Sequence, residues 1–78
     1  MKYNNLEFQW SDVNERYELV KWEGSSCFVI AFFEKHKEGY DMRTVGNRFF
    51  EHEGAFLIAK HALCFLNEVF KERGDDTI

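Results

Sequence analysis

The side chains of this sequence that could bind a metal ion are few and scattered. No two of them have the spacing of a metal site, such as CxxC or HxxxH. His52 lies between two glutamates in "EHE", but neighbouring side chains rarely point the same way, so we expect no shared site there. The sequence therefore predicts no metal and no other cofactor. The candidates considered are His36, His52, His61, Cys27 and Cys64.

Nucleophilic catalysis has equally little support. Cys64 and His61 would lie three residues apart on a helix and could touch, but chance gives the same spacing in a helix that contains both. Ser25 and Ser26 fall in a turn, where serine is favoured for backbone reasons. The sequence has neither a GxSxG motif nor a glycine-rich phosphate loop. We therefore expect a protein that is not an enzyme.

The composition is typical of one small folded domain with a surplus of aromatic side chains. The chain has 78 residues, of which 45% are hydrophobic and 18% aromatic. A chain of this size buries only about 60% of its surface, so part of the apolar area should be used outside the core. The net charge of −4 gives no general attraction to nucleic acid or to anionic lipid. With two cysteines and no apolar leader segment, the sequence predicts a cytoplasmic protein with reduced, at least half-buried thiols and no membrane contact.

The hydrophobic pattern predicts an antiparallel meander followed by one helix. Strands are expected over 6–10, 16–22, 27–34, 40–45 and 48–51, the last two joined by a Gly46–Asn47 turn. Residues 54–73 have helical periodicity. We expect a single α+β domain over residues 1–78, with four or five strands packed on one face by the helix. Its predicted core includes Phe28, Ile30, Phe32, Leu66 and Val69.

The stretch "CFVIAFF", residues 27–33, offers no polar side chain on either face of its strand. One helix covers one face, so the second face needs another cover, and a second copy of the chain is the simplest one. A five-residue loop over 11–15 would add Leu6, Phe8 and Trp10 to this face. A shift of one residue in any loop would move all of these side chains of a strand to the opposite face. The alternative left open is that the N-terminal segment covers it. We expect a homodimer through Val20, Trp22, Val29, Phe33, Val45 and Phe50.

Basic and aromatic residues on the same predicted face leave a second function open. Such surfaces hold single-stranded nucleic acid by base stacking and phosphate contacts. Glu18 and Asp41 lie on that face too and the domain is acidic, so protein binding is favoured over nucleic acid binding. The residues of this alternative are Arg16, Trp22, Phe33, Arg43, Arg48 and Phe50.

The stretch "YELVKWEGSSCFVIAFFEKHKEGYDMRTVGNRFF", with a helix behind it, resembles small uncharacterised proteins of phages and prophages of Gram-positive bacteria. The resemblance covers about half the chain and carries over no functional residues. It implies an accessory protein that acts on a host or defence protein. The layout of curved strands and one helix also looks like a dimeric single-strand-binding fold. The residues and the resemblance together predict a non-catalytic, homodimeric binding protein whose partner the sequence does not identify.

Overall fold

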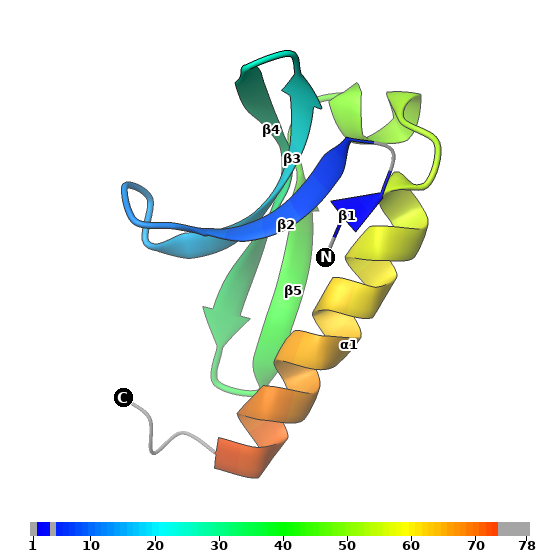
Figure 1. Cartoon of the computed structure of the whole chain (residues 1–78). Helices are drawn as coiled ribbons and strands as arrows, with labels where there is room; N and C mark the ends of the chain where they lie inside the picture. The colour runs from blue at the N-terminus through cyan, green and yellow to red at the C-terminus, as the bar shows by residue number, and fades with distance from the viewer. Residues whose placement is uncertain (1, 4, 74–78) are drawn as a thin grey trace.

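The strands of the protein form one antiparallel sheet in chain order, and the helix follows them (Figure 1). The computed structural model describes residues 2, 3 and 5–73. The short 3₁₀ helix η1 (Arg48–Glu51) precedes the helix α1 (Ala55–Arg73). The predicted α+β meander with one C-terminal helix is confirmed. The described residues form five strands, which are β1 (Lys2–Tyr3), β2 (Leu6–Ser11), β3 (Arg16–Glu23), β4 (Ser26–His36) and β5 (Gly39–Thr44).

The predicted strand at 48–51 is wrong, because these residues form η1. The Phe50 N–H donates to the Asn47 carbonyl at 3.1 Å, which closes a turn where a hairpin was expected. The turn directs Phe49 into the core, where it is 3% exposed, and leaves Phe50 73% exposed. A strand would also have pointed these neighbours apart, but only the turn brings Phe49 beneath the start of α1. The sheet has a further strand that was not predicted, β1, which pairs with β2.

The loop between β2 and β3 is one residue shorter than predicted. β2 continues through Ser11, which pairs with Arg16, so the loop covers residues 12–15. Because side chains alternate along a strand, this single residue moves the apolar set of β2 from the second face to the helix side. The prediction for these residues is therefore wrong. The residues concerned are Leu6, Phe8 and Trp10, of which the last two pair with Leu19 and Tyr17.

A β-bulge in β4 explains the apolar run "CFVIAFF". The adjacent residues Leu19 and Val20 of β3 pair with residues 31 and 29 of β4, so Ile30 is an extra residue. The alternation of β4 changes phase at this point, and Ile30, Ala31 and Phe33 all join the core on the helix side. Two predictions are corrected by the bulge. Phe33 is buried beneath the helix at 1% exposure, and Phe32 is half-buried on the opposite face.

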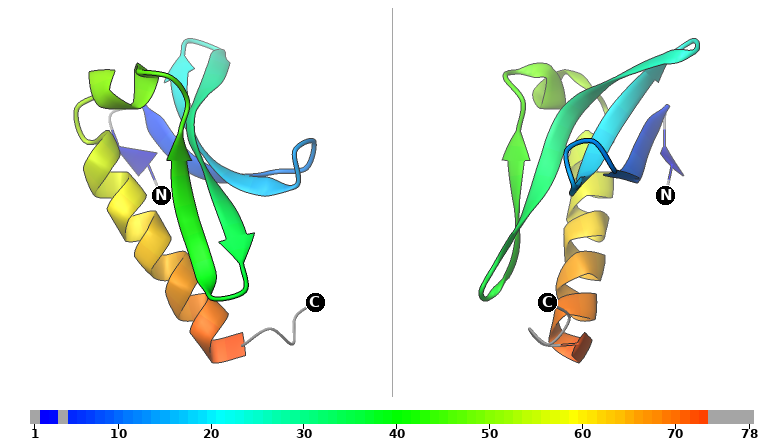
Figure 2. Two further views of the ribbon diagram at one scale, coloured as in Figure 1. Left: turned by 180° about the vertical axis from the view of Figure 1, so that it is seen from behind. Right: turned by 90° about the vertical axis from the view of Figure 1, so that its left-hand side faces the viewer.

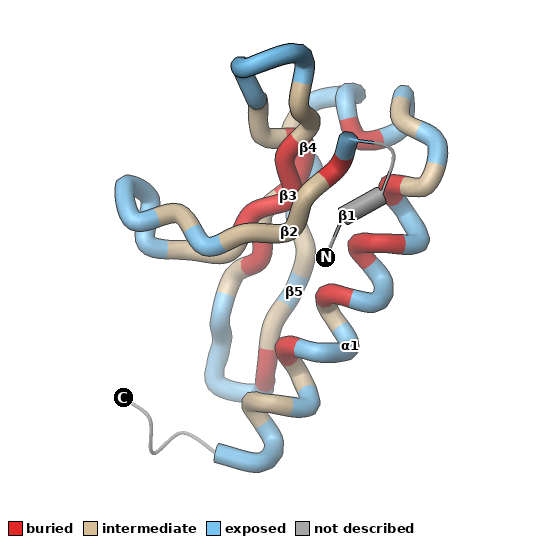
Figure 3. The backbone as a smooth tube through the Cα atoms, in the orientation of Figure 1, coloured by how far each residue is buried: buried red, intermediate tan, exposed pale blue. Residues whose placement is uncertain are grey.

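The core lies between α1 and the sheet (Figure 3). The buried face of α1 is rich in alanine near its start, which lets the helix lie close to the strands. The predictions of Ile30 and Leu66 as core residues are confirmed, whereas Phe28 and Val69 are half-buried at its edge. The buried helix residues are Ala55, Ile58, Ala59, Ala62 and Leu66, and they pack on Leu6, Leu19, Ile30, Ala31 and Phe33.

The sheet is bent, and the bend opens one end of the helix side. The tip of the β2–β3 hairpin curves away from α1, whereas the β4–β5 hairpin reaches down to the C-terminal half of α1 (Figures 1 and 2). Bulges increase the local twist of a strand, so the bulge at Ile30 agrees with this bend. The last turns of the helix therefore face the β4–β5 hairpin without cover from the tip of β2–β3. No helix in the described part of the chain is both long and apolar enough to cross a membrane.

Candidate functional site

The centre of the second sheet face is covered by the chain's own side chains. Val20 is 1% exposed there and Glu18 is 3% exposed. The Glu18 carboxylate accepts hydrogen bonds from Arg16 Nε at 2.9 Å and from Asn14 Nδ2 at 2.8 Å. The guanidinium carbon of Arg16 also lies 3.8 Å from the centre of the Phe32 ring. In this part of the second face, where an open aromatic surface was expected, a buried valine lies near a hydrogen-bonded cluster of Asn14, Arg16 and Glu18.

The residues predicted as the dimer interface do not share one surface. Val20 is buried on the second face and Phe33 is buried on the helix side. Trp22 is half-buried, and its Nε1–H donates to Glu7 Oε1 at 2.8 Å across the sheet. Phe50 lies exposed on η1. The remaining two members, Val29 and Val45, are half-buried.

The residues of the nucleic acid alternative are also divided between surfaces. Arg16 is bound to Glu18, and Arg43 Nε lies 3.1 Å from Glu34 Oε1 on the second face. Arg48 belongs to η1, where its guanidinium carbon lies 4.5 Å from the centre of the Phe28 ring. Each predicted arginine therefore already contacts a carboxylate or an aromatic ring of its own chain.

The candidates for metal binding and nucleophilic chemistry do not converge either. Across residues 5–73, no group of three or more histidine, cysteine or acidic side chains is placed to hold a metal ion. His36 Nε2 lies 3.1 Å from Asp41 Oδ2 on the β4–β5 hairpin, which is a surface pair. Cys27 and Cys64 are exposed and not joined in a disulfide, so the prediction that both thiols are at least half-buried is wrong.

A cup lined by aromatic rings lies where the bend opens the helix side. It is a cleft of about 290 Å³ between the last turns of α1 and the strands. Tyr17 comes from the start of β3, Lys35 from the end of β4 and Tyr40 from the start of β5. The helix supplies Phe65, Leu66, Val69, Phe70 and Arg73. We call these eight residues the aromatic cup.

The rings of the cup hold one another in place by edge and stacking contacts. The Tyr17 ring stacks on Phe8 with 5.2 Å between ring centres, and the Trp10 ring meets its edge at 4.9 Å. Tyr17 and Tyr40 are 6.4 Å apart, and Tyr40 and Phe70 are also 6.4 Å apart. Pairs at these separations contribute about 0.5–1.5 kcal/mol each beyond area burial. These ring contacts fix the positions of Tyr17, Tyr40 and Phe70, so the cup is preorganised.

The charged side chains that line the cup differ from those that line the neighbouring hollow. The Lys35 ammonium lies 5.8 Å from the centre of the Phe70 ring, and Arg73 closes the end of the cup. Among the described residues that line the cup, none carries a carboxylate. A second hollow of about 520 Å³ shares Tyr17, Lys35 and Tyr40 with the cup and is mixed in charge. Its other lining residues are Trp10, Glu15, Arg16, Phe32, Phe33 and Glu34.

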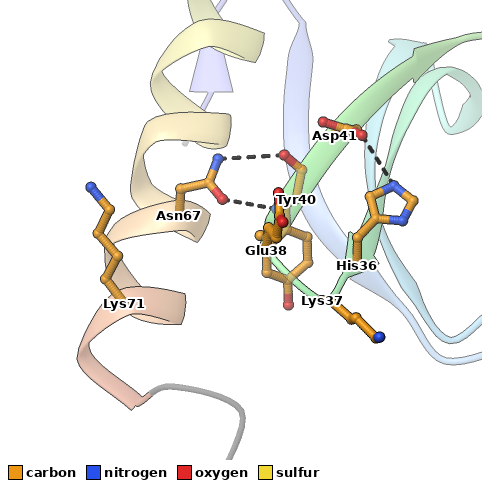
Figure 4. A pocket seen from close by; sticks show the side chains of 8 residues that line it. His36, Lys37, Glu38, Tyr40, Asp41, Asn67 and Lys71 are labelled. Atoms are coloured by element: carbon orange, nitrogen blue, oxygen red, sulfur yellow. Dashed lines mark hydrogen bonds and ion pairs between the residues drawn. The ribbon is translucent and has the colours of Figure 1, made fainter.

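Tyr40 is the residue on which the cup depends most. Burial, followed by the nearby Tyr17, raises the pKa of the Tyr40 phenol above its ordinary value. The Tyr40 N–H donates to Asn67 Oδ1 at 2.8 Å, and Asn67 Nδ2 donates back to the Tyr40 carbonyl at 3.4 Å (Figure 4). The side-chain amide of Asn67 thus takes the place of a neighbouring strand at this edge of β5 and ties the hairpin to α1.

Gly39 permits this close approach. Its φ is 142°, and a Cβ atom at this position would collide with the Asn67 side chain. The open hollow of about 820 Å³ around this contact is lined by polar side chains of the β4–β5 hairpin and of α1, and Lys37 and Lys71 lie on its opposite sides (Figure 4). The contact between Asn67 and Tyr40 has a structural role there, because it joins the hairpin to the helix.

The sequence contained one signal for the cup. The apolar arc of the helix is broader than a single packed stripe and includes Phe65 and Phe70. A helix with so broad an apolar arc carries more apolar side chains than the core beneath it can bury. The tyrosines opposite it could not be placed without the register of the sheet.

No protein-family model matches the chain, and no significantly similar curated protein or solved structure was found.

Proposed function

We propose that the protein is a non-catalytic binding protein that holds a side chain of a partner protein in the aromatic cup. The observation that carries this proposal is a preorganised aromatic cleft at the open end of the core. Tyrosine, tryptophan and arginine are the residues most enriched at the energetic centres of protein interfaces. The cup combines Tyr17, Tyr40 and Arg73, and the half-exposed Trp10 stands beside it.

The lining of the cup supports binding rather than chemistry. Its described residues include no cysteine, serine or histidine, and its phenol with a raised pKa is a poor acid or base at neutral pH. The volume of about 290 Å³ lies at the lower end of the range for small-molecule pockets. It suits one side chain of a larger partner. A partner protein is also what the resemblance to phage accessory proteins implies, and the free cysteines agree with the cytoplasmic location proposed for it.

The experiment that tests the proposal is selection from a displayed library of random seven-residue peptides. We expect the wild-type protein to enrich peptides with a shared apolar residue, and Phe65→Ser to lose that enrichment. Val13→Ser is the control, because Val13 is an apolar side chain that is 91% exposed and does not line the cup. Equal enrichment by both variants, or none by the wild type, would refute the proposal.

The homodimer is proposed only in a narrower form, for the apolar side chains around the start of α1. Phe50, Phe56 and Leu57 are 73%, 71% and 51% exposed, which is unusual for residues of this size. We expect light scattering behind a sizing column to show a dimer that Phe50→Ser weakens. A monomer at submillimolar concentration would end the dimer proposal and leave the cup unaffected.

A further inference from the structure

We infer that the outer edge of β5 binds an extended segment of a partner protein as an added strand. β5 is the last strand in the order of the sheet, so within the described part of the chain no strand pairs with it on that side. A strand edge offers N–H and C=O groups at every second residue, and their spacing fits another extended backbone. Met42 and Thr44 of this edge are not among the residues that line the aromatic cup, so the inference goes beyond the proposed function and does not rest on it.

The hydrogen bonds of β5 show which of its residues face outward. The Tyr40 N–H donates to Asn67 Oδ1 at 2.8 Å and the Tyr40 carbonyl accepts from Asn67 Nδ2 at 3.4 Å, so these backbone groups point away from β4. The Val45 N–H instead donates to a carbonyl of β4 at 3.0 Å. Because the two directions alternate along an antiparallel strand, Met42 and Thr44 share the outward direction of Tyr40.

The Asn67 side chain already occupies the first outward position in the way that a strand would. Its amide pairs with both backbone groups of Tyr40, so this edge accepts an amide partner. Beyond this contact the helix leaves the edge, since α1 and β5 lie close at the β4–β5 hairpin and diverge toward η1 (Figure 2). Thr44 is accordingly exposed, and Met42 is half-buried. The groups of these two residues are the ones to which an added strand would bind.

The side of α1 that faces this edge offers apolar contacts to an added strand. Phe56, Leu63 and Asn67 have the i, i+7, i+11 spacing of residues on one side of a helix. Leu63 and Asn67 line a hollow of about 270 Å³, and Phe56 is 71% exposed. A strand paired with Met42 and Thr44 would turn every second side chain toward the helix. The partner segment is thus one with apolar residues at alternate positions.

A second copy of the chain fits this edge less well than a different protein. Two copies of β5 paired about a two-fold axis at Met42 would need the backbone groups of Tyr40, which Asn67 already occupies. An axis one residue further along would place Arg43 opposite its own copy, with like charges facing each other. The next axis would need pairing through Gly46, which lies beyond the strand at a φ of 57°. An extended segment of another protein meets none of these obstacles.

The test is a titration of isotope-labelled protein with a short peptide, followed through the amide NMR signals of Met42 and Thr44. The probe is Lys-Thr-Val-Thr-Val-Thr-Lys with blocked ends, which has apolar residues at alternate positions. Its control is the same peptide with every residue between the lysines N-methylated, so that these residues have no N–H to donate. We expect the first peptide to shift both signals and the control to shift neither. Binding at the cup would instead shift the signals of Tyr17 and Phe70.

Two substitutions of Thr44 form a matched pair. Thr44→Pro removes an outward N–H without breaking a hydrogen bond to β4, whereas Thr44→Val keeps the N–H and the shape of the side chain. Thr44→Pro should weaken peptide binding by roughly three- to tenfold, and Thr44→Val by less than about twofold. If Thr44→Pro does not fold, the N-methylated peptide tests the same hydrogen bonds on the wild-type protein.

Amide hydrogen exchange of the free protein tests whether the edge is open. Asp41 and Arg43 alternate with the outward residues and bond to β4, so they are the internal control. We expect the amides of Met42 and Thr44 to exchange faster than these two, and to slow when the peptide is added.

Four results would overturn the inference. They are unshifted signals of Met42 and Thr44 at millimolar peptide, equal binding of the N-methylated peptide, equal affinities of the two Thr44 variants, and slow exchange at both positions in the free protein. The last would mean that the edge is already covered, by the chain itself or by a second copy. The proposed function would stand in each case, because the signals of the cup and the peptide selection report it independently.

Discussion

Two neighbouring phenylalanines offer the most direct test of the β-bulge in β4. Without the bulge, strict alternation would place Phe32 beneath the helix and Phe33 on the second face. With it, Phe33 is 1% exposed in the core and its ring meets Phe8 edge to face at 5.5 Å. Phe32 is half-buried beneath Arg16 on the opposite face. We predict that Phe33→Ala is much more destabilising than Phe32→Ala.

The structure sets the size of the difference. Removing a fully buried phenylalanine costs about 3–5 kcal/mol, the sum of lost transfer energy and the cavity left behind. Phe32→Ala loses a cation–π contact of about 0.5–1 kcal/mol and a similar amount of partial burial, so about 1–2 kcal/mol in all. A domain of this length has roughly 4–12 kcal/mol of unfolding free energy in total. Phe33→Ala should therefore remove at least about a quarter of this unfolding free energy, and at the lower end of the range all of it.

The assay is urea unfolding followed by tryptophan fluorescence and circular dichroism. For a domain of this size the slope is about 1 kcal/mol per molar urea, so the Phe32→Ala midpoint should fall by roughly 1–2 M. Phe33→Leu keeps the position apolar and should cost only about 1–1.5 kcal/mol, which keeps the variant measurable if Phe33→Ala does not fold. The matching Phe32→Leu variant should cost less than half as much.

The opposite order of stabilities would refute the bulge. If Phe32→Leu were more destabilising than Phe33→Leu, the strand would alternate without interruption and Phe33 would face away from the helix. Equal effects would mean that both faces are equally covered, as in a tight dimer, and light scattering on the same samples would then show the dimer.

Three further predictions concern the contacts around the cup and the second face. Asn67→Ala removes both hydrogen bonds to Tyr40, so stability should fall by about 1–2 kcal/mol and amide exchange at Tyr40 should accelerate. Arg16→Ala leaves the buried Glu18 short of a partner and should cost about 1–3 kcal/mol in urea unfolding; adding Glu18→Gln should recover part of it, and no recovery would contradict the pairing. The pKa of Tyr40 is raised above 10.0, mainly by burial and then by Tyr17, because the folded state favours the neutral phenol. Its contribution to stability is thus complete below pH 10.0 and lost as the pH rises through the raised pKa, and Tyr40→Phe should abolish this loss together with the late step in tyrosinate absorbance.

The identities of most elements could be predicted from the sequence because their signals are local. The alternation of "LEFQW" and the periodicity of the last third are enough to place β2 and α1 within a residue or two. The error at 48–51 also has a local cause. "RFFE" has strand propensity, but these residues form a turn in which Phe49 is buried in the core.

The face of the sheet on which each side chain lies could not be predicted, because adding or removing a single residue in a loop or strand reverses it. In the loop over 12–15, Glu15 has a φ of 54°, a left-handed conformation that glutamate seldom adopts. The sequence alone therefore does not indicate a loop of this length. The Asn14 N–H donates to Ser11 Oγ at 3.1 Å within this turn, and that stabilising contact is visible only in the folded chain. At the bulge, every residue from 27 to 33 is apolar, and no polar side chain marks the change of phase.

The shorter β2–β3 loop and the bulge in β4 both move aromatic side chains to the helix side of the sheet, which is the side where the candidate site lies. The four-residue loop brings Phe8 and Trp10 to the helix side, and the bulge brings Phe33 there. Near its start, α1 turns Ala55, Ala59 and Ala62 toward the core. Toward its end the helix presents Phe65 and Phe70 instead, and the tip of β2–β3 has curved away from them (Figure 1). Part of the aromatic surplus that composition places outside the core thus lies at the open end of the helix side. On the proposed function, a partner's side chain would enter between the helix and the two tyrosines, so substitutions in the cup, rather than on the second face, test that proposal.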